Sequence, residues 1–210
     1  MSDSISSAEK TNVPDMESRV VERHPFTPFL PPNAKVLMLG SFPPQPKRWA
    51  MDFFYPNYTN DMWRIMGHIF KHDADCFVDK ANKCYREEAL RQFLEETGIA
   101  LFDTAMAVIR TTGTASDKDL VIVEPTDLSL LLSQIPQCKA VVATGQKAAE
   151  NICAAYQCEM PAIGSFTPIQ IAGKMLRFYR MPSTSRAYPL KMERKAEPYA
   201  RMMREIGLLG

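Results

Sequence analysis

The chain has 210 residues, of which 46% are hydrophobic and 23% are charged, a balance typical of a folded globular protein. Its net charge is only +1, so contact with nucleic acid would need a local patch of lysine and arginine. No apolar run approaches the ~18 residues of a membrane span, and the polar N-terminus does not resemble a signal peptide, so we expect a cytoplasmic protein without membrane contact.

Cysteine and histidine spacing predicts neither a metal site nor a cofactor. His68 and His72 are four residues apart, a spacing that can bind a metal on a helix, but no third ligand accompanies them. No Cys-x-x-Cys pair occurs, so we expect reduced thiols rather than disulfides or an iron–sulfur cluster. The cysteines are Cys76, Cys84, Cys138, Cys153 and Cys158.

The N-terminal part of the chain changes from polar to apolar. Residues 1–18 are Ser-rich and predict a disordered tail, followed by one domain over 19–210. A Pro-rich segment, HPFTPFLPPN, leads into KVLMLG at 35–40, whose continuous apolar character predicts a buried parallel strand. The loop over 41–59 is rich in Pro and aromatic residues, and loops of this length are usually functional.

Cap residues and apolar spacing indicate the elements in the middle of the chain. Asn60 and Thr126 can each cap a helix, and Gly98 is a signal for a helix end. The elements expected are helices over 60–70 and 86–98, a buried strand over 99–103, a stretch over 104–125 that is polar and irregular in its middle, and a helix over 127–135.

The C-terminal part continues the alternation of strands and helices. We expect a strand over 139–144, a helix over 146–156, two strands over 168–173 and 174–181, a loop over 182–189 and a helix over 195–207. The alternation predicts the α/β class, as a three-layer α/β/α sandwich with a central, mainly parallel sheet of four to five strands. The loops after Gly40, Asp103 and Met181 all leave strand carboxyl ends, where ligands bind in open α/β sheets.

Three segments carry a resemblance to a known family. They are LGSFPP (39–44) with FFYPNYTNDMW (53–63), GIALFDTAMAVIRTTGTASDKDL (98–120) and MPSTSRAY (181–188). In this order the chain from His24 onward resembles the uracil-DNA glycosylase superfamily, closest to the groups of hypoxanthine-DNA glycosylases and mismatch-specific uracil glycosylases. The resemblance implies a monomeric DNA repair enzyme that flips a deaminated base out of DNA and hydrolyses its N-glycosidic bond, leaving an abasic site.

The resemblance also implies which residues bind the base. Gly40, Ser41 and Phe42 fall in the motif after the first strand, and Tyr55 falls where these enzymes place an aromatic ring beneath the flipped base. Phe54 is a neighbour that could exchange roles with Tyr55. The alternative is that both rings only pack the loop against the core.

Asp103 is the candidate for reading the base, at a position where the superfamily often has asparagine. An ionised carboxylate only accepts hydrogen bonds, so it would suit the N–H of a lactam such as uracil or hypoxanthine. Protonation would restore a donor. The alternative role is a helix or loop cap.

The catalytic position departs from the better-known groups. Those place Asn or Asp two residues after the glycine of the first motif, where this chain has Phe42, which cannot activate water. In the hypoxanthine-glycosylase-like group an Asn precedes a Phe-Trp pair, and Asn60 before Met62 and Trp63 matches it. An amide can orient water without acting as a base. Asn60 is equally well explained as a helix cap, and both roles are compatible.

The segment 183–186 resembles the loop that grips the phosphate backbone beside the lesion, through Ser183, Thr184, Ser185 and Arg186. The alternative is a solvated turn. Ser116, Asp117 and Asp119 are weaker candidates for shaping the pocket. A basic rim beside Trp49 would consist of Lys47, Arg48, Arg110, Lys191, Arg194 and Lys195, unless these side chains only solubilise the surface.

Two other functions stay open. Phe42 at the usual catalytic position favours a module that binds damaged DNA without cutting it. An unrelated small-molecule protein is suggested by Gly145 after a strand, but neither a P-loop nor G-x-G-x-x-G is present. The three histidines, including His24, indicate no role, and none lies in the loop after Met181, where uracil-specific relatives carry one.

Overall fold

The computed structural model describes residues 20–111 and 119–210. The tail expected over 1–18 lies outside the described residues, and so do Ser116 and Asp117. Within the described ranges, no helix is long and apolar enough to cross a membrane. The same ranges contain no group of three or more His, Cys, Asp or Glu residues placed to hold a metal ion.

A five-stranded sheet forms the centre of the fold, in the order β5-β2-β8-β10-β9. Four of these strands are parallel, and β9 pairs antiparallel with β10 at one edge. The predicted central, mainly parallel sheet is therefore confirmed. Its strands are β2 (Val36–Gly40), β5 (Ile99–Asp103), β8 (Ala140–Ala143), β9 (Ser165–Ile171) and β10 (Lys174–Arg180).

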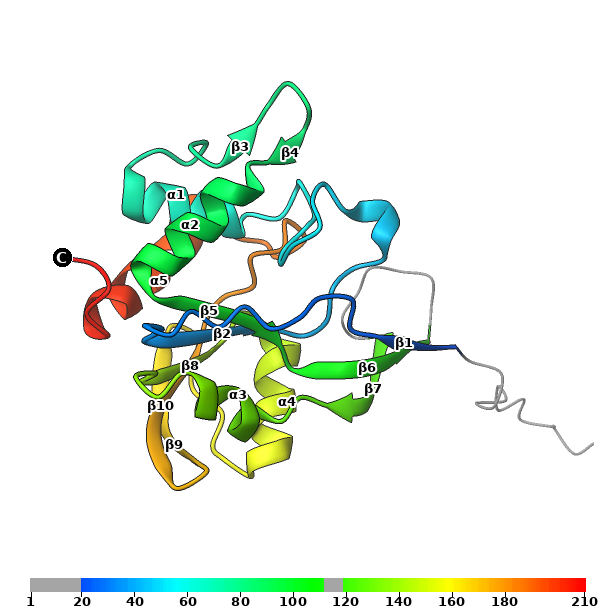
Figure 1. Cartoon of the computed structure of the whole chain (residues 1–210), viewed down its shortest axis with the longest axis vertical. Coiled ribbons are helices and arrows are strands. Elements are labelled where there is room, and N and C mark those ends of the chain that lie inside the picture. Colours follow the sequence, from blue (N-terminus) through cyan, green and yellow to red (C-terminus); the bar gives the residue numbers. More distant parts are fainter. Residues whose placement is uncertain (1–19, 112–118) are drawn as a thin grey trace, which may run out of the picture.

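Helices cover both faces of this sheet, which makes the three layers that the alternation predicted (Figure 1). One face carries α1 (Met62–Lys71), α2 (Glu87–Thr97) and α5 (Met192–Glu205), and the other carries α3 (Leu128–Gln134) and α4 (Gln146–Tyr156).

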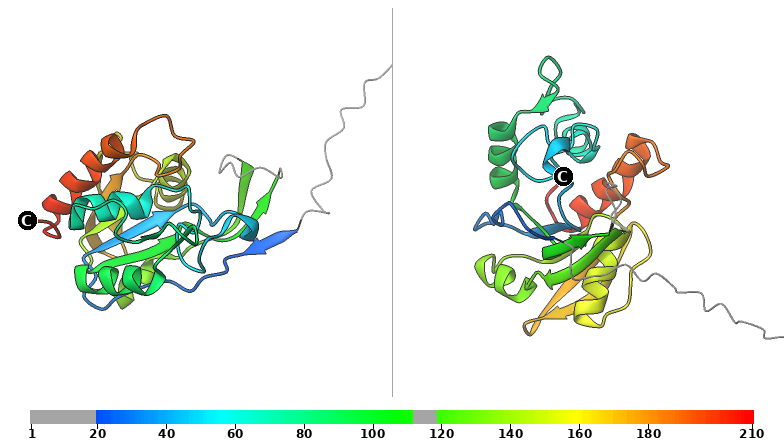
Figure 2. Two further views of the ribbon diagram at one scale, coloured as in Figure 1. Left: turned by 90° about the horizontal axis from the view of Figure 1, so that it is seen from above. Right: turned by 90° about the vertical axis from the view of Figure 1, so that its right-hand side faces the viewer.

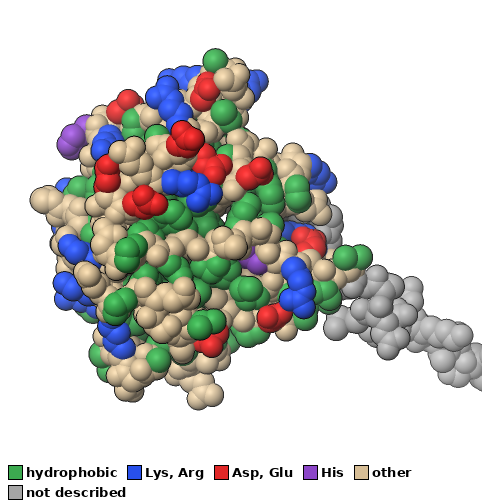
Figure 3. All heavy atoms as spheres, in the orientation of Figure 1, with side chains coloured by type: hydrophobic (Ala, Val, Ile, Leu, Met, Phe, Trp, Pro, Cys, Tyr) green, Lys and Arg blue, Asp and Glu red, His purple; other side chains and the backbone are tan. Residues whose placement is uncertain are grey.

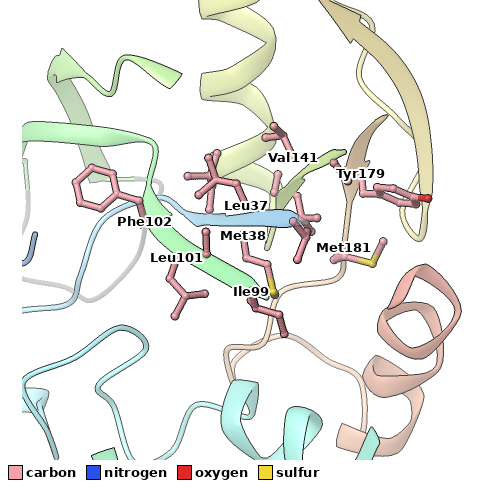
Figure 4. Packing of buried hydrophobic residues seen from close by; sticks show 14 of the residues in the cluster. Leu37, Met38, Ile99, Leu101, Phe102, Val141, Tyr179 and Met181 are labelled. Carbon is pink, nitrogen blue, oxygen red and sulfur yellow. The ribbon is translucent and has the colours of Figure 1, made fainter. Parts of the chain in front are cut away.

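Side chains of the central strands alternate between the two faces, so both layers of helices pack on apolar residues (Figure 4). Leu37 and its neighbour Val141 point toward α4, whereas Met38, Ile99 and Leu101 point to the opposite face. Each of these side chains is at most 1% exposed. The continuous apolar runs in the sequence are thus explained by strands buried on both faces.

A second, three-stranded sheet projects from one end of the molecule (Figure 2). It consists of β1 (Val21–Arg23), β6 (Ala105–Arg110) and β7 (Leu120–Pro125). The stretch over 104–125 is predicted to be irregular in its middle, and residues 112–118 of that middle lie outside the described residues; strands form on both sides of it. Among the described residues of this stretch, the buried hydrophobics are Ala105, Ala107, Val108 and Leu120, so these strands have little apolar alternation by which the sequence could reveal them.

Smaller elements and helix ends also differ from expectation. A hairpin of β3 (Val78–Asp79) and β4 (Cys84–Tyr85) precedes α2, and a 3-10 turn covers Pro46–Arg48. Asp127, not Thr126, caps α3, because its Oδ1 accepts from the backbone N–H groups of Ser129 and Leu130. Helix α5 begins three residues before the predicted start and contains Pro198 in its interior.

Candidate active site

The carboxyl ends of the parallel strands bring the predicted loops to one edge of the sheet. Gly40 and Asp103 end neighbouring strands and are paired in register. Thr144 follows β8, and its N–H donates to the carbonyl of Leu39 at 3.0 Å. Met181 follows β10 and donates to Ala143 at 2.8 Å. This edge is where an open α/β sheet binds its ligands.

Gly40 lets Asp103 and Tyr55 approach each other. A side chain at position 40 would place its Cβ in collision with Oδ1 of Asp103 and 3.7 Å from the hydroxyl of Tyr55. The missing side chain is therefore a requirement of this close packing. Three of the predicted site residues meet at this point.

Tyr55 holds an uncommon backbone conformation, with φ of 50°. A non-glycine residue in this region stores strain, and such strain is concentrated at functional sites. Its hydroxyl lies 2.9 Å from Oγ1 of Thr144, and its ring packs edge-on to Trp63 of α1 at 5.9 Å between centroids. These contacts fix the ring, which is partly exposed, at the edge of the sheet.

The other aromatic candidates lie inside the core. Phe42 is 8% exposed and packs in a small apolar cluster with Ala105, Val108 and Leu120. Phe54 is 2% exposed and touches the rings of other core aromatics. Ser41 is buried, and its carbonyl accepts from Oγ1 of Thr104 at 3.4 Å. Tyr55 is thus the partly exposed member of this group, and its stacking on a base stays a prediction.

His24 is the site residue that sequence analysis missed. Its Nε2 lies 2.9 Å from Oδ2 of Asp103, and its side chain is 0% exposed. It follows β1, whose antiparallel pairing with β6 carries His24 to the end of β5; the N–H of His24 donates to Met106 at 2.8 Å. A lone histidine in a Pro-rich segment gives no signal of this contact, because it depends on strand pairing between distant parts of the chain.

Asn60 makes the side-chain contact of a helix cap, one residue before the N-cap position at Asp61. Its Oδ1 accepts from the N–H of Met62 at 2.9 Å, at the start of α1. Its carbonyl accepts from the hydroxyl of Tyr85 at 2.9 Å. The cap uses one lone pair of Oδ1, and an amide offers a second lone pair and two N–H donors for water. The placing of a water by Asn60 stays a prediction.

The loop over 182–189 is tied to the start of α1. The N–H of Asp61 donates to the carbonyl of Thr184 at 2.9 Å. Lys195 of α5 is 1% exposed, and its Nζ donates to Oδ2 of Asp61 and to the carbonyl of Ser185, both at 2.8 Å. Hydrogen bonds and a buried ion pair therefore connect the start of α1, next to Asn60, to the predicted phosphate loop.

A buried tyrosine fixes the other end of this loop. Tyr199 is completely buried, and its hydroxyl donates to the carbonyl of Pro182 at 3.0 Å. Burial, with a smaller contribution from Tyr55, raises the pKa of Tyr199 well above its usual value, so the hydroxyl remains a donor. Ser183 lies beside Gly145, whose Cβ would be 3.7 Å from that of Ser183, so the loop reaches the start of α4.

The predicted basic rim is only partly exposed. Lys195 is buried, so its assignment to the rim is wrong. The assignment of Arg110 to the rim is wrong as well, because its side chain is 8% exposed and donates to Glu22 and to the carbonyl of Pro43. Lys47, Arg48 and Lys191 are exposed. On the face shown in Figure 3, cationic and acidic side chains are interspersed.

A cavity of about 520 Å³ is lined in part by Phe42. Trp49 and Arg110 are part of its wall, and the indole N–H of Trp49 donates to the carbonyl of Pro44 at 2.7 Å. Tyr55 and Asp103 are not part of its wall. The cavity is therefore separate from the place where these two side chains meet.

Comparison with known proteins gives a likeness in fold. No protein-family model matches the chain, and no curated protein matches it. Among solved structures, the chain is similar to the solution NMR structure of "a putative Uracil DNA glycosylase" from Methanosarcina acetivorans, with a TM-score of 0.61 and 20% sequence identity. The match covers 89% of this chain and 99% of the other. The chain therefore has the same α/β fold as that protein.

Proposed function

We propose that the protein is a monofunctional DNA glycosylase that excises a deaminated base, hypoxanthine or uracil, by hydrolysing its N-glycosidic bond. The observation that carries the proposal is the meeting of Tyr55 and Asp103 over Gly40, at the edge of the sheet where this fold binds ligands. The similar fold of a protein described as a putative uracil DNA glycosylase supports it.

A flipped base needs one group to stack on and one to read its edge. The ring of Tyr55 supplies the stacking surface, held by Thr144 and Trp63. A base stacked on an aromatic ring gains ~1–3 kcal/mol. The carboxylate of Asp103 accepts the N–H on the Watson–Crick edge of a lactam base.

The water that replaces the base needs orientation more than activation. If the glycosidic bond breaks early, the sugar becomes an oxocarbenium-like cation that neutral water can attack. Asn60 would orient this water through its amide, because no carboxylate stands at the Phe42 position. No lysine is required, so we expect no strand cleavage after base removal.

The loop over 182–189 would hold the strand on either side of the flipped base. Ser183 and Ser185 offer hydroxyl groups, and exposed backbone N–H groups are ordinary phosphate ligands. The Nε of Arg186 lies 3.8 Å from Oδ1 of Asp61. Because 59% of the Arg186 side chain is exposed, it can turn toward DNA. The partner proposed for this loop is DNA that contains a damaged base.

Single-turnover cleavage of labelled oligonucleotides tests the proposal. Strands carrying uracil, hypoxanthine, xanthine or a G·T mismatch would be incubated with the protein and then treated with alkali. We expect alkali-labile product from a deaminated base, lost in Asn60→Ala and in Asp103→Ala. Absence of product from all four substrates would contradict the proposal.

One observation favours a second function, a module that binds damaged DNA without cutting it. Phe42 is turned into an apolar cluster at the position where other members of the superfamily carry a catalytic Asn or Asp. This function predicts lesion-dependent binding in a gel-shift assay with no alkali-labile product. Product formation from any lesion rules it out.

A further inference from the structure

The imidazole of His24 is enclosed by aromatic rings. The centroids of Phe102, Phe42 and Phe26 lie 4.5, 5.4 and 5.9 Å from its own. A polar ring buried in this way is costly unless its nitrogens find partners. Both do: Nε2 meets Asp103, and Nδ1 meets the backbone of Phe26.

The partners of Nδ1 are compatible with a proton on Nε2. Nδ1 lies 2.9 Å from the carbonyl oxygen of Phe26 and accepts from the N–H of the same residue at 3.2 Å. A neutral ring can therefore accept at Nδ1, and a charged ring can donate there. In both of these states the proton on Nε2 remains and points to Oδ2 of Asp103, so Oδ2 receives a hydrogen bond.

The second oxygen of Asp103 is the one near the site. Oδ1 lies so close to Gly40 that a Cβ there would collide with it, and the hydroxyl of Tyr55 is beside the same point. Tyr55, from the loop after β2, is a titratable group close to Asp103, and Arg110 of β6 lies over Phe42, which packs against His24. The guanidinium of Arg110 lies 5.6 Å from the ring centroid of Phe42 and is paired with Glu22 of β1.

We propose that His24 is a positioning residue that sets base selectivity, by donating from Nε2 to Oδ2 and so keeping Asp103 a hydrogen-bond acceptor. This inference rests on the proposed glycosylase function. It gives the substrate class as bases whose Watson–Crick ring nitrogen carries a hydrogen, which includes hypoxanthine, xanthine and uracil. Adenine and cytosine present a lone pair at that nitrogen, which faces the carboxylate unfavourably.

The selectivity has a chemical purpose. Deamination converts adenine to hypoxanthine and cytosine to uracil, and in each case the ring nitrogen changes from acceptor to donor. A fixed acceptor at Asp103 therefore separates hypoxanthine from adenine and uracil from cytosine. Guanine and thymine also carry a ring N–H, so Asp103 does not exclude them. A site built around one hydrogen bond can reject a base lacking its partner by up to about 10⁴-fold.

Two variants of His24 test this role. His24→Phe keeps a ring among the surrounding phenylalanines but removes the donor, whereas His24→Gln keeps an amide donor. Without the donor, Oδ2 of Asp103 loses the hydrogen bond that holds it as an acceptor. In His24→Phe we expect the preference for hypoxanthine over adenine in single-turnover excision to fall about tenfold relative to wild type. His24→Gln should retain the wild-type preference.

The contrary result is slower excision in His24→Phe with an unchanged preference for hypoxanthine over adenine, which would reduce His24 to a packing residue. Failure of the proposed function is seen separately, as a wild-type protein that excises no base. If the wild-type protein excises no base, or if His24→Phe does not fold, nitrogen-15 NMR of the wild-type protein shows which ring nitrogen of His24 carries the proton. Protonation of Nε2 between about pH 5.5 and 8.5 supports the inference, and a ring protonated only at Nδ1 overturns it.

Discussion

Lys195 of α5 and Asp61 at the start of α1 form a buried ion pair, with Nζ 2.8 Å from Oδ2 and side chains 1% and 8% exposed. Lys195 also bonds to the carbonyl of Ser185. The pair therefore joins two helices and the loop over 182–189, which places Asn60 and the predicted phosphate contacts in a fixed relation.

Replacing Lys195 by Met leaves the charge of Asp61 buried without its main partner. We expect the free energy of unfolding to fall by ~3–5 kcal/mol, because removing one member of a buried pair strands the other. Urea denaturation measures this. The neighbouring Arg194→Met is the control: its side chain is 68% exposed and pairs with Glu197 on the surface, so it should cost less than ~1 kcal/mol. Equal stability of the two variants would contradict the account.

Asn60 has two separable roles. Asn60→Ala removes the cap on Met62, which should lower stability by ~1 kcal/mol, and removes the amide that orients water, which should slow excision by at least ~10²-fold. Asn60→Asp keeps a capping oxygen and should retain the stability. Single-turnover rates and urea denaturation of both variants separate the effects. An Asn60→Ala protein that is less stable but excises at the wild-type rate would show that Asn60 is only a cap.

Tyr55 is expected to act through its ring more than through its hydroxyl. Tyr55→Phe loses the hydrogen bond to Thr144, worth ~0.5–1.5 kcal/mol of stability, but keeps the stacking surface. Tyr55→Ala should weaken binding of lesion DNA by ~1–3 kcal/mol, with little change for undamaged DNA. Fluorescence anisotropy with both DNAs measures this. Lesion binding by Tyr55→Ala that matches wild type would exclude stacking.

Tyr85 makes the stability of the fold depend on pH in the alkaline range. Burial, opposed by the nearby Arg64, raises the pKa of Tyr85 from 10.0 to about 12. Because the folded-state pKa is above the unfolded value, this contribution to stability is complete below about pH 10 and is lost as pH rises toward 12. The rise of the Tyr85 pKa from 10.0 to about 12 corresponds to ~2.7 kcal/mol of folding free energy.

Tyr85→Phe isolates that contribution from those of the other tyrosines. Near pH 8 the variant should be less stable than wild type, since it loses the hydrogen bonds to the carbonyls of Tyr58 and Asn60. The difference should shrink between about pH 10 and 12. Thermal unfolding across this range measures it, and a constant difference would contradict the expected titration.

The central sheet was predictable because its strands are continuous apolar runs. The runs over 35–40 and 139–144 can be buried on both faces, and helix signals between them indicate parallel pairing. The hairpin around Gly173 was also predictable, because glycine readily adopts the positive φ that tight turns need. In the structure this glycine has φ of 77°. By contrast, β6 and β7 contain few buried apolar residues, and they form through pairing with each other and with β1.

The candidate site was predictable where a residue follows a strand and not where it depends on tertiary contacts. Asp103 and Gly40 stand at strand ends, so their proximity follows from the sheet. His24 reaches Asp103 across 79 residues of sequence, and Lys195 reaches Asp61 across 134. Neither contact has a local signal, since each depends on how β1 or α5 is placed in the fold.

The most direct test of the glycosylase proposal is detection of the products from one hypoxanthine-containing duplex by mass spectrometry. Wild-type protein should release free hypoxanthine and an intact strand with one abasic site in equal amounts, with no protein–DNA adduct trapped by borohydride. The contradictory result is lesion-dependent binding with no release of either base: no free hypoxanthine from this duplex and no free uracil from a matched uracil-containing duplex. That result would leave a protein that only binds damaged DNA.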